Sequence, residues 1–116
     1  MNHNPEVHEV SDLSDRQTNC LTIVVAATPD DGNPLRSRHV LGIIAEVIEP
    51  NHPKIYDALG RLVAPTLVFS GITDLVDLGL LDLTDRGYVP TQRGRELANP
   101  FPNPQLASDI QQWIEE

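Results

Sequence analysis

The apolar residues between positions 66 and 78 recur at intervals of three and four, which is the period of an α-helix. On a helical wheel one face of this segment is apolar and carries Val68, Ile72, Leu75 and Val76. The opposite face is polar and carries Thr66, Ser70, Thr73, Asp74 and Asp77. The pattern predicts an amphipathic helix with one buried face. Gly79 is expected to end it, because glycine adopts the left-handed C-cap conformation at the least cost.

Beyond this helix the pattern changes to that of a β-hairpin. Residues 81–84 (Leu-Asp-Leu-Thr) alternate between apolar and polar, which is the strand period. Residues 85–87 (Asp-Arg-Gly) are a turn signal, and a return strand begins at Tyr88. We expect this second strand to be short or at a sheet edge, because Pro90 donates no ladder hydrogen bond. Thr91 is expected to cap the next helix through its hydroxyl.

A first helix is predicted from Leu13 to the breaker Pro29. Ser14 and Gln17 have the spacing of a capping box, in which each side chain bonds the backbone N–H of the other residue. The run 23–25 (Ile-Val-Val) is β-branched, so a strand is an alternative to a helix at these positions. The segment 29–34 is dense in proline, glycine, aspartate and asparagine, which indicates a loop.

Two more helices precede the amphipathic one. Residues 36–48 predict a helix that Ser37 could cap, with an apolar face of Val40, Leu41, Ile44, Val47 and Ile48. The segment 49–53 is expected to end this helix, and Pro53 can occupy the first position of a third, short helix. The apolar positions of that helix are Ile55, Leu59, Leu62 and Val63. Residues 53–78 therefore form a predicted helix-turn-helix.

This order of elements resembles the winged-helix family, which includes the MarR-like and PadR-like transcription regulators. The resemblance is carried by the run 75–81 (Leu-Val-Asp-Leu-Gly-Leu-Leu), the short hairpin and the segment 86–97 (Arg-Gly-Tyr-Val-Pro-Thr-Gln-Arg-Gly-Arg-Glu-Leu). Pro90 departs from the pattern, because such families usually have leucine there. The resemblance implies that the second helix of the pair enters the major groove of DNA. The expected fold is mostly α with a small β-hairpin (α+β), a winged helix-turn-helix with an appended C-terminal helix.

We expect four parts along the chain: a disordered tail over 1–12, the winged-helix domain over 13–98, a proline-rich spacer over 99–104 and an amphipathic helix over 105–116. Asn103 and Pro104 supply the cap and first position of this last helix. One of its faces carries Leu106, Ile110, Trp113 and Ile114. Because so short a helix is unstable alone in water, this face is predicted to contact a second copy of the chain. Packing on its own domain and disorder are the alternatives.

The chain is strongly acidic, with 17 Asp and Glu against 8 Lys and Arg and a formal net charge of −9. Lys54 is the single lysine, and aromatic residues are few. This composition is typical of a salt-adapted proteome such as that of a halophilic archaeon; a high-GC mesophile or its phage is the alternative. Net charge would repel DNA at low salt, but molar salt shortens the Debye length to about 3 Å.

Candidate catalytic chemistry is absent from the sequence. There is no Ser-His-Asp or Cys-His grouping with supporting glycines and no glycine-rich phosphate loop, so we expect no enzyme and no cofactor. The lone Cys20 sits in an apolar run and permits no disulfide framework, and His3 and His8 lack the further ligands of a metal site. No apolar run is long enough to span a membrane, and there is no signal peptide. These features favour the cytoplasm.

The candidate DNA contacts are the cations flanking the predicted motif and the hydroxyls of its second helix: Arg36, Arg38, His52, Lys54, Arg61, Thr66, Ser70, Thr73, Arg86, Arg93 and Arg95. Among them Arg86 occupies the hairpin tip, from which a wing reaches a minor groove. The polar helix face lacks the Arg, Lys, Asn and Gln side chains that pair best with base edges. Two functions follow. The first is a dimeric transcription regulator that binds double-stranded DNA. The second is a winged-helix module whose acidic helix face binds a basic protein in a transcription, replication or antiviral complex.

Overall fold

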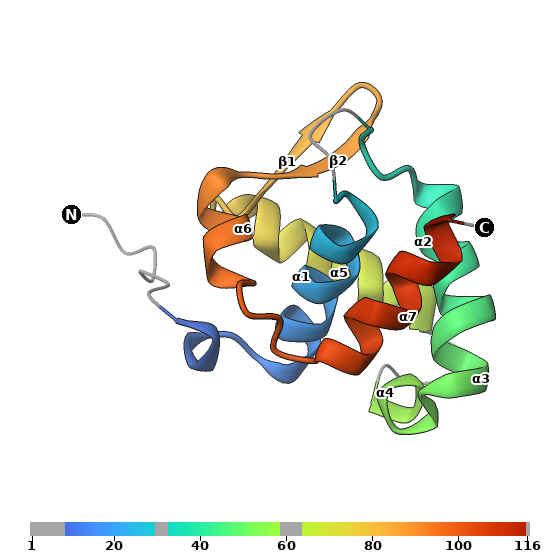
Figure 1. Ribbon diagram of the computed structural model, residues 1–116. Helices are drawn as coiled ribbons and strands as arrows, with labels where there is room; N and C mark the ends of the chain where they lie inside the picture. The colour runs from blue at the N-terminus through green and yellow to red at the C-terminus, as the bar shows by residue number, and fades with distance from the viewer. Residues whose placement is uncertain (1–8, 30–32, 59–63, 116) are drawn as a thin grey trace.

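The computed structural model describes residues 9–29, 33–58 and 64–115 and folds them into a mostly helical unit with a two-stranded antiparallel hairpin (Figure 1). Helix α1 (Asp15–Ala27) runs through its centre. Every residue from Cys20 to Ala27 is buried. A helix that is apolar on all sides is stable only when neighbours cover every side, and α5, α7 and the hairpin strand β2 pack around α1.

The predicted capping box at the start of α1 is confirmed. The backbone N–H of Gln17 donates to Ser14 Oγ over 3.1 Å, and the N–H of Ser14 donates to Gln17 Oε1 over 3.0 Å. The β-branched run 23–25 is helical and not a strand. Burial on every side therefore outweighs the modest preference of these residues for extended backbone.

Helix α5 (Ala64–Asp77) is the predicted amphipathic helix, and Val68, Ile72 and Leu75 on its apolar face have no exposed surface. It crosses α1 closely at Gly71. A Cβ atom at this position would lie 2.6 Å from Cys20 Sγ, so only glycine lets the two helices approach this far.

The second predicted helix begins and ends differently from expectation. Arg36, without a side-chain cap, is the N-cap of α2 (Ser37–Ile43), so Ser37 is the first helical residue and not the cap. A π-helical turn, η2 (Ile44–Ile48), and α3 (Glu49–Asn51) continue the helix, so Pro50 does not break it. Proline has no N–H to donate and its ring crowds the carbonyl four residues earlier; the wider turn just before Pro50 shifts the hydrogen bonds, as Glu49 N–H donates to Ile44 O.

The apolar face of this continuous helix also differs in one position. Leu41, expected inside, is 44% exposed, whereas Ile43 is fully buried. The buried set Val40, Ile43, Ile44, Val47 and Ile48 has the spacing of one apolar helix face that packs on a core.

Helix α4 (Pro53–Ala58) begins at Pro53 as predicted. The predicted apolar positions Leu59, Leu62 and Val63, and the turn that joins α4 to α5, lie outside the described residues.

The end of α5 and the hairpin follow the sequence prediction. Gly79 has a φ of 78°, and the N–H groups of Gly79 and Leu80 donate to Val76 O and Leu75 O, which together form a Schellman motif. Strands β1 (Leu81–Thr84) and β2 (Gly87–Pro90) pair antiparallel, with Leu81 opposite Pro90 and Thr84 opposite Gly87. Leu81 is buried, but Leu83 is 63% exposed, so just one of the two strand leucines reaches the core.

Thr91 joins the hairpin to helix α6 (Gln92–Leu97). Its Oγ1 accepts from the N–H of Gly94 over 3.1 Å, which confirms the predicted cap, and donates to Gly79 O over 2.8 Å. Gly94 then lies so close to the residue before β1 that a Cβ there would clash with Leu80 O. The helix end, the hairpin and α6 are thus held as one unit.

The N-terminal end of the described chain is more ordered than expected, whereas the C-terminal helix forms as predicted. Part of the predicted tail forms a 3-10 helix, η1 (Val10–Asp12), whose capping box joins Glu9 and Asp12. Helix α7 (Pro104–Glu115) is capped by Asn103 Oδ1, which accepts from Leu106 N–H over 3.2 Å. It lies against α1 and η2, so residues 99–104 join it to the same core and do not separate it.

Burial gives Cys20 a testable chemistry. It raises the pKa of the thiol to about 12, because the buried site disfavours the charged thiolate. Since the unfolded thiol has an ordinary pKa of about 8.5, the unfolded state loses its proton first, and the free energy of unfolding falls as pH rises from about 9 towards 12.

We expect a thiol-specific reagent at pH 8 to modify Cys20 in the native protein at the rate of unfolding, and to modify it fast in denaturant. Rapid modification of the native protein would contradict this burial.

Candidate nucleic-acid interface

A backbone bridge brings the beginning of α2 to the hairpin. Leu35 N–H donates to Tyr88 O and Tyr88 N–H donates to Leu35 O, both over 2.8 Å. Arg36 directly follows Leu35, and Arg86 directly precedes Gly87 in the hairpin turn. The bridge thereby places two arginines that are far apart in the sequence on one side of the molecule.

Arg36 and Arg86 line two neighbouring hollows. The larger is an open cleft of about 860 Å³, which His39 and Trp113 also line. The smaller, of about 410 Å³, lies along the hairpin between Ser37 and Thr84. Of the described residues that line the larger cleft, none is Asp or Glu. The described lining of the larger cleft thus carries two arginines and no carboxylate, whereas Asp85 lines the smaller hollow beside the same two arginines.

The arginines of this surface are available for a ligand. Within the described ranges, Arg36, Arg38 and Arg86 form no ion pair with a carboxylate, and all three side chains are exposed. Thr84 Oγ1 accepts from Arg86 N–H over 3.1 Å and donates to Gly87 O over 2.8 Å, which fixes the backbone of the turn. Arg38 lines neither hollow, so we call Arg36 and Arg86 the hairpin cations.

The structure does not bring all the predicted cations together. Lys54 lies on α4, which Figure 1 shows at the opposite end of the molecule from the hairpin turn. Arg93 and Arg95 lie on α6, next to the base of the hairpin and not at its tip. Arg95 Nη2 donates to Thr28 O over 2.8 Å, so this guanidinium caps the end of α1. Arg61 lies outside the described residues.

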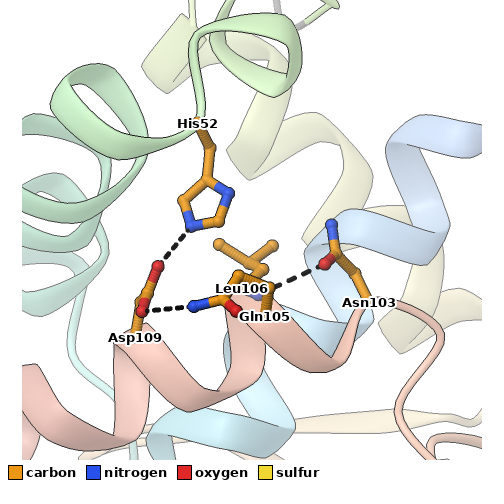
Figure 2. Close-up of polar contacts among 5 residues, drawn as sticks. All are labelled: His52, Asn103, Gln105, Leu106 and Asp109. Carbon is orange, nitrogen blue, oxygen red and sulfur yellow. Dashed lines mark hydrogen bonds and ion pairs between the residues drawn. The ribbon is translucent and has the colours of Figure 1, made fainter.

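His52, predicted as a DNA contact, forms an interaction within the protein. Its Nε2 lies 2.7 Å from Asp109 Oδ2, and just 10% of its side chain is exposed (Figure 2). Gln105 Nε2 donates to Asp109 Oδ1 over 3.0 Å from the same helix. The pair joins the turn between α3 and α4 to α7.

The outward face of α5 matches its prediction. Thr66, Ser70, Thr73 and Asp77 are exposed in one stripe. Thr73 Oγ1 donates to its own helix, at Phe69 O over 2.9 Å, and the half-buried Asp74 accepts from Gln17 Nε2 over 3.4 Å. This stripe offers hydroxyls and one exposed carboxylate, and no cation.

The predicted dimer face is divided by the fold. Leu106 and Ile110 have no exposed surface and belong to the chain's own core, which fits the alternative of self-packing. Trp113 and Ile114 are half-buried. The Trp113 ring packs on Gly42, where a Cβ would lie 2.9 Å from Cζ2, and its Nε1 donates to Glu46 Oε2 over 3.3 Å.

Sequence reasoning missed the Leu35–Tyr88 bridge and the cleft beside it. Leu35 is a single apolar residue after Asn33 and Pro34, which gives no periodic signal. In the described ranges no group of His, Cys, Asp and Glu side chains is arranged to hold a metal ion, and no helix there has the length and apolarity to cross a membrane. Comparison with protein-family models, curated proteins and solved structures found no significant match to this chain.

Proposed function

We propose that this chain is a DNA-binding transcription regulator of the winged-helix type. One observation carries the proposal: Arg36 and Arg86 line the same two hollows at the hairpin and have no carboxylate partner among the described residues. The order of α4, α5 and hairpin supports it. The hairpin cations contact phosphates, and the hydroxyls of α5 touch bases or phosphates in the adjacent groove.

In this proposal, different residues provide the affinity for DNA and the preference for a DNA sequence. Phosphate contacts supply sequence-independent affinity that falls with salt, and here the hairpin cations make them. Thr66 and Ser70 form weaker and less selective contacts to base edges than Arg or Asn would. The proposed regulator therefore has a modest sequence preference, with binding dominated by the hairpin side.

The test is duplex binding across salt. We expect the protein to enrich duplexes from a random pool at some salt between low and molar. Replacing Arg36→Gln or Arg86→Gln should each lower the slope of log affinity against log salt by about one, because each removes one phosphate contact. Arg16→Gln is the matched control, since Arg16 lies in the first turn of α1, away from the lining of either hollow.

Thr66→Ala and Ser70→Ala should change the selected sequences and leave the salt slope as it is. If Arg16→Gln lowers the salt slope as much as Arg86→Gln does, the proposed surface is wrong. If the protein enriches no duplex at any salt concentration, the proposal of DNA binding is wrong. The exposed Asp77 and the cation-free α5 stripe then favour the alternative, a protein-binding module; in that case Asp77→Lys should abolish capture of a basic partner.

A further inference from the structure

The larger cleft combines two kinds of group that phosphate binding alone does not need. Arg36 and Arg86 supply positive charge, while Trp113 and Ile114 supply an apolar wall from the end of α7. Its volume of about 860 Å³ is within the range of roughly 300–1,000 Å³ that small-molecule sites occupy. Backbone phosphates of a closed duplex would meet the arginines and leave this apolar wall without a partner.

The Trp113 ring is held in place before any ligand arrives. Gly42 contacts its six-membered edge and Glu46 accepts from its Nε1, and both of these residues belong to the helix that Arg36 caps. Neither Gly42 nor Glu46 is among the residues that line the cleft. A ring that is fixed from one helix and borders an open cleft is a preorganised stacking surface.

We propose that this cleft binds a nucleotide, with its base against Trp113 and its phosphate between Arg36 and Arg86. Aromatic side chains stack on any base because every base has a π-face, and guanidinium groups bind phosphate with charge-assisted, often bidentate hydrogen bonds. His39, half-buried in the same lining, faces the cleft as a further polar group. The nucleotide is either free or an unpaired nucleotide of a DNA strand.

The inference shares Arg36 and Arg86 with the proposed duplex contact but does not depend on it. Trp113 is the single tryptophan of the chain, so its fluorescence reports on this cleft and on no other place. We would titrate the full chain with dAMP, with a single-stranded oligothymidylate, with a closed duplex and with ribose 5-phosphate, which carries phosphate without a base.

We expect saturable quenching by dAMP or by the oligothymidylate and none by ribose 5-phosphate. Quenching by dAMP identifies a free nucleotide as sufficient, and quenching by the oligothymidylate alone identifies a nucleotide within a strand. Arg36→Gln and Arg86→Gln should each weaken the apparent affinity about tenfold, while Arg16→Gln should leave it unchanged.

The proposal is overturned if neither base-containing probe quenches, if ribose 5-phosphate quenches as strongly, or if Arg16→Gln weakens binding as much as Arg86→Gln. Trp113→Phe, measured by calorimetry, keeps an aromatic ring and should retain most of the affinity; Trp113→Leu should lose it. Duplex enrichment without nucleotide quenching would reject the nucleotide site and leave the proposed function standing, and the reverse result would reject the duplex contact alone.

Discussion

Replacing Ile110→Ala is expected to lower the free energy of unfolding by about 3 kcal/mol, within the usual range for removing a large aliphatic side chain from a core. Ile110 has no exposed surface and lies on α7 where that helix packs against α1. The loss should be the same at low and high protein concentration, because the contact is within one chain. Chemical denaturation followed by circular dichroism measures it.

Gln112→Ala, at an exposed position of the same helix, is the control and should change stability by less than about 0.5 kcal/mol. If the cost of Ile110→Ala grew with dilution, or fell to the level of Gln112→Ala, α7 would belong to an interface between chains and not to this core.

Gly94→Ala is expected to cost more than about 3 kcal/mol and to leave little folded protein. The new Cβ would clash with Leu80 O and lie 3.1 Å from Leu80 C, and both atoms are backbone just before the hairpin. No rotamer change relieves this contact, so either α6 or β1 has to move. Thermal unfolding of the purified variant, or its yield of folded protein, tests the expectation.

Gly79→Ala provides the contrast. At Gly79 a Cβ would meet nothing within 4 Å, so the cost comes from the φ of 78° alone and should be about 1 kcal/mol. Equal losses in the two variants would show that close approach at Gly94 is not what fixes the hairpin to α6.

The parts of the fold that the sequence predicted are those with a local signal. The capping box at Ser14, the helix period of 66–78, Gly79 and the Thr91 cap each involve residues within a few positions of one another, and all are present in the structure. The π-helical turn before Pro50 was beyond such reasoning, because proline more often ends a helix than passes through one. The wide apolar run 40–48 also left open which of Leu41 and Ile43 faces the core.

The candidate site was harder to predict because its geometry depends on long-range contacts. His52 and Asp109 are 57 positions apart, and Arg95 and Thr28 are 67 apart. Their position near the predicted motif therefore led to the prediction that His52 and Arg95 contact DNA. In the structure both side chains also form contacts within the protein. The sequence predicts Arg36 and Arg86 as DNA contacts. That they line the same hollows depends on the Leu35–Tyr88 bridge, which no local sequence pattern predicts.

The packing of α7 on α1 has a consequence for how the chain is made. Helix α1 is synthesised before α7, one of the helices that cover it, and α7 ends at Glu115. A ribosome must therefore release nearly the whole described chain before α1 can be enclosed, and until then the run Cys20–Ala27 presents its apolar side chains to the cell. Closing so large a loop is slow relative to local helix formation. Between the synthesis of α1 and that of α7, the nascent chain is thus exposed to chaperones and to aggregation.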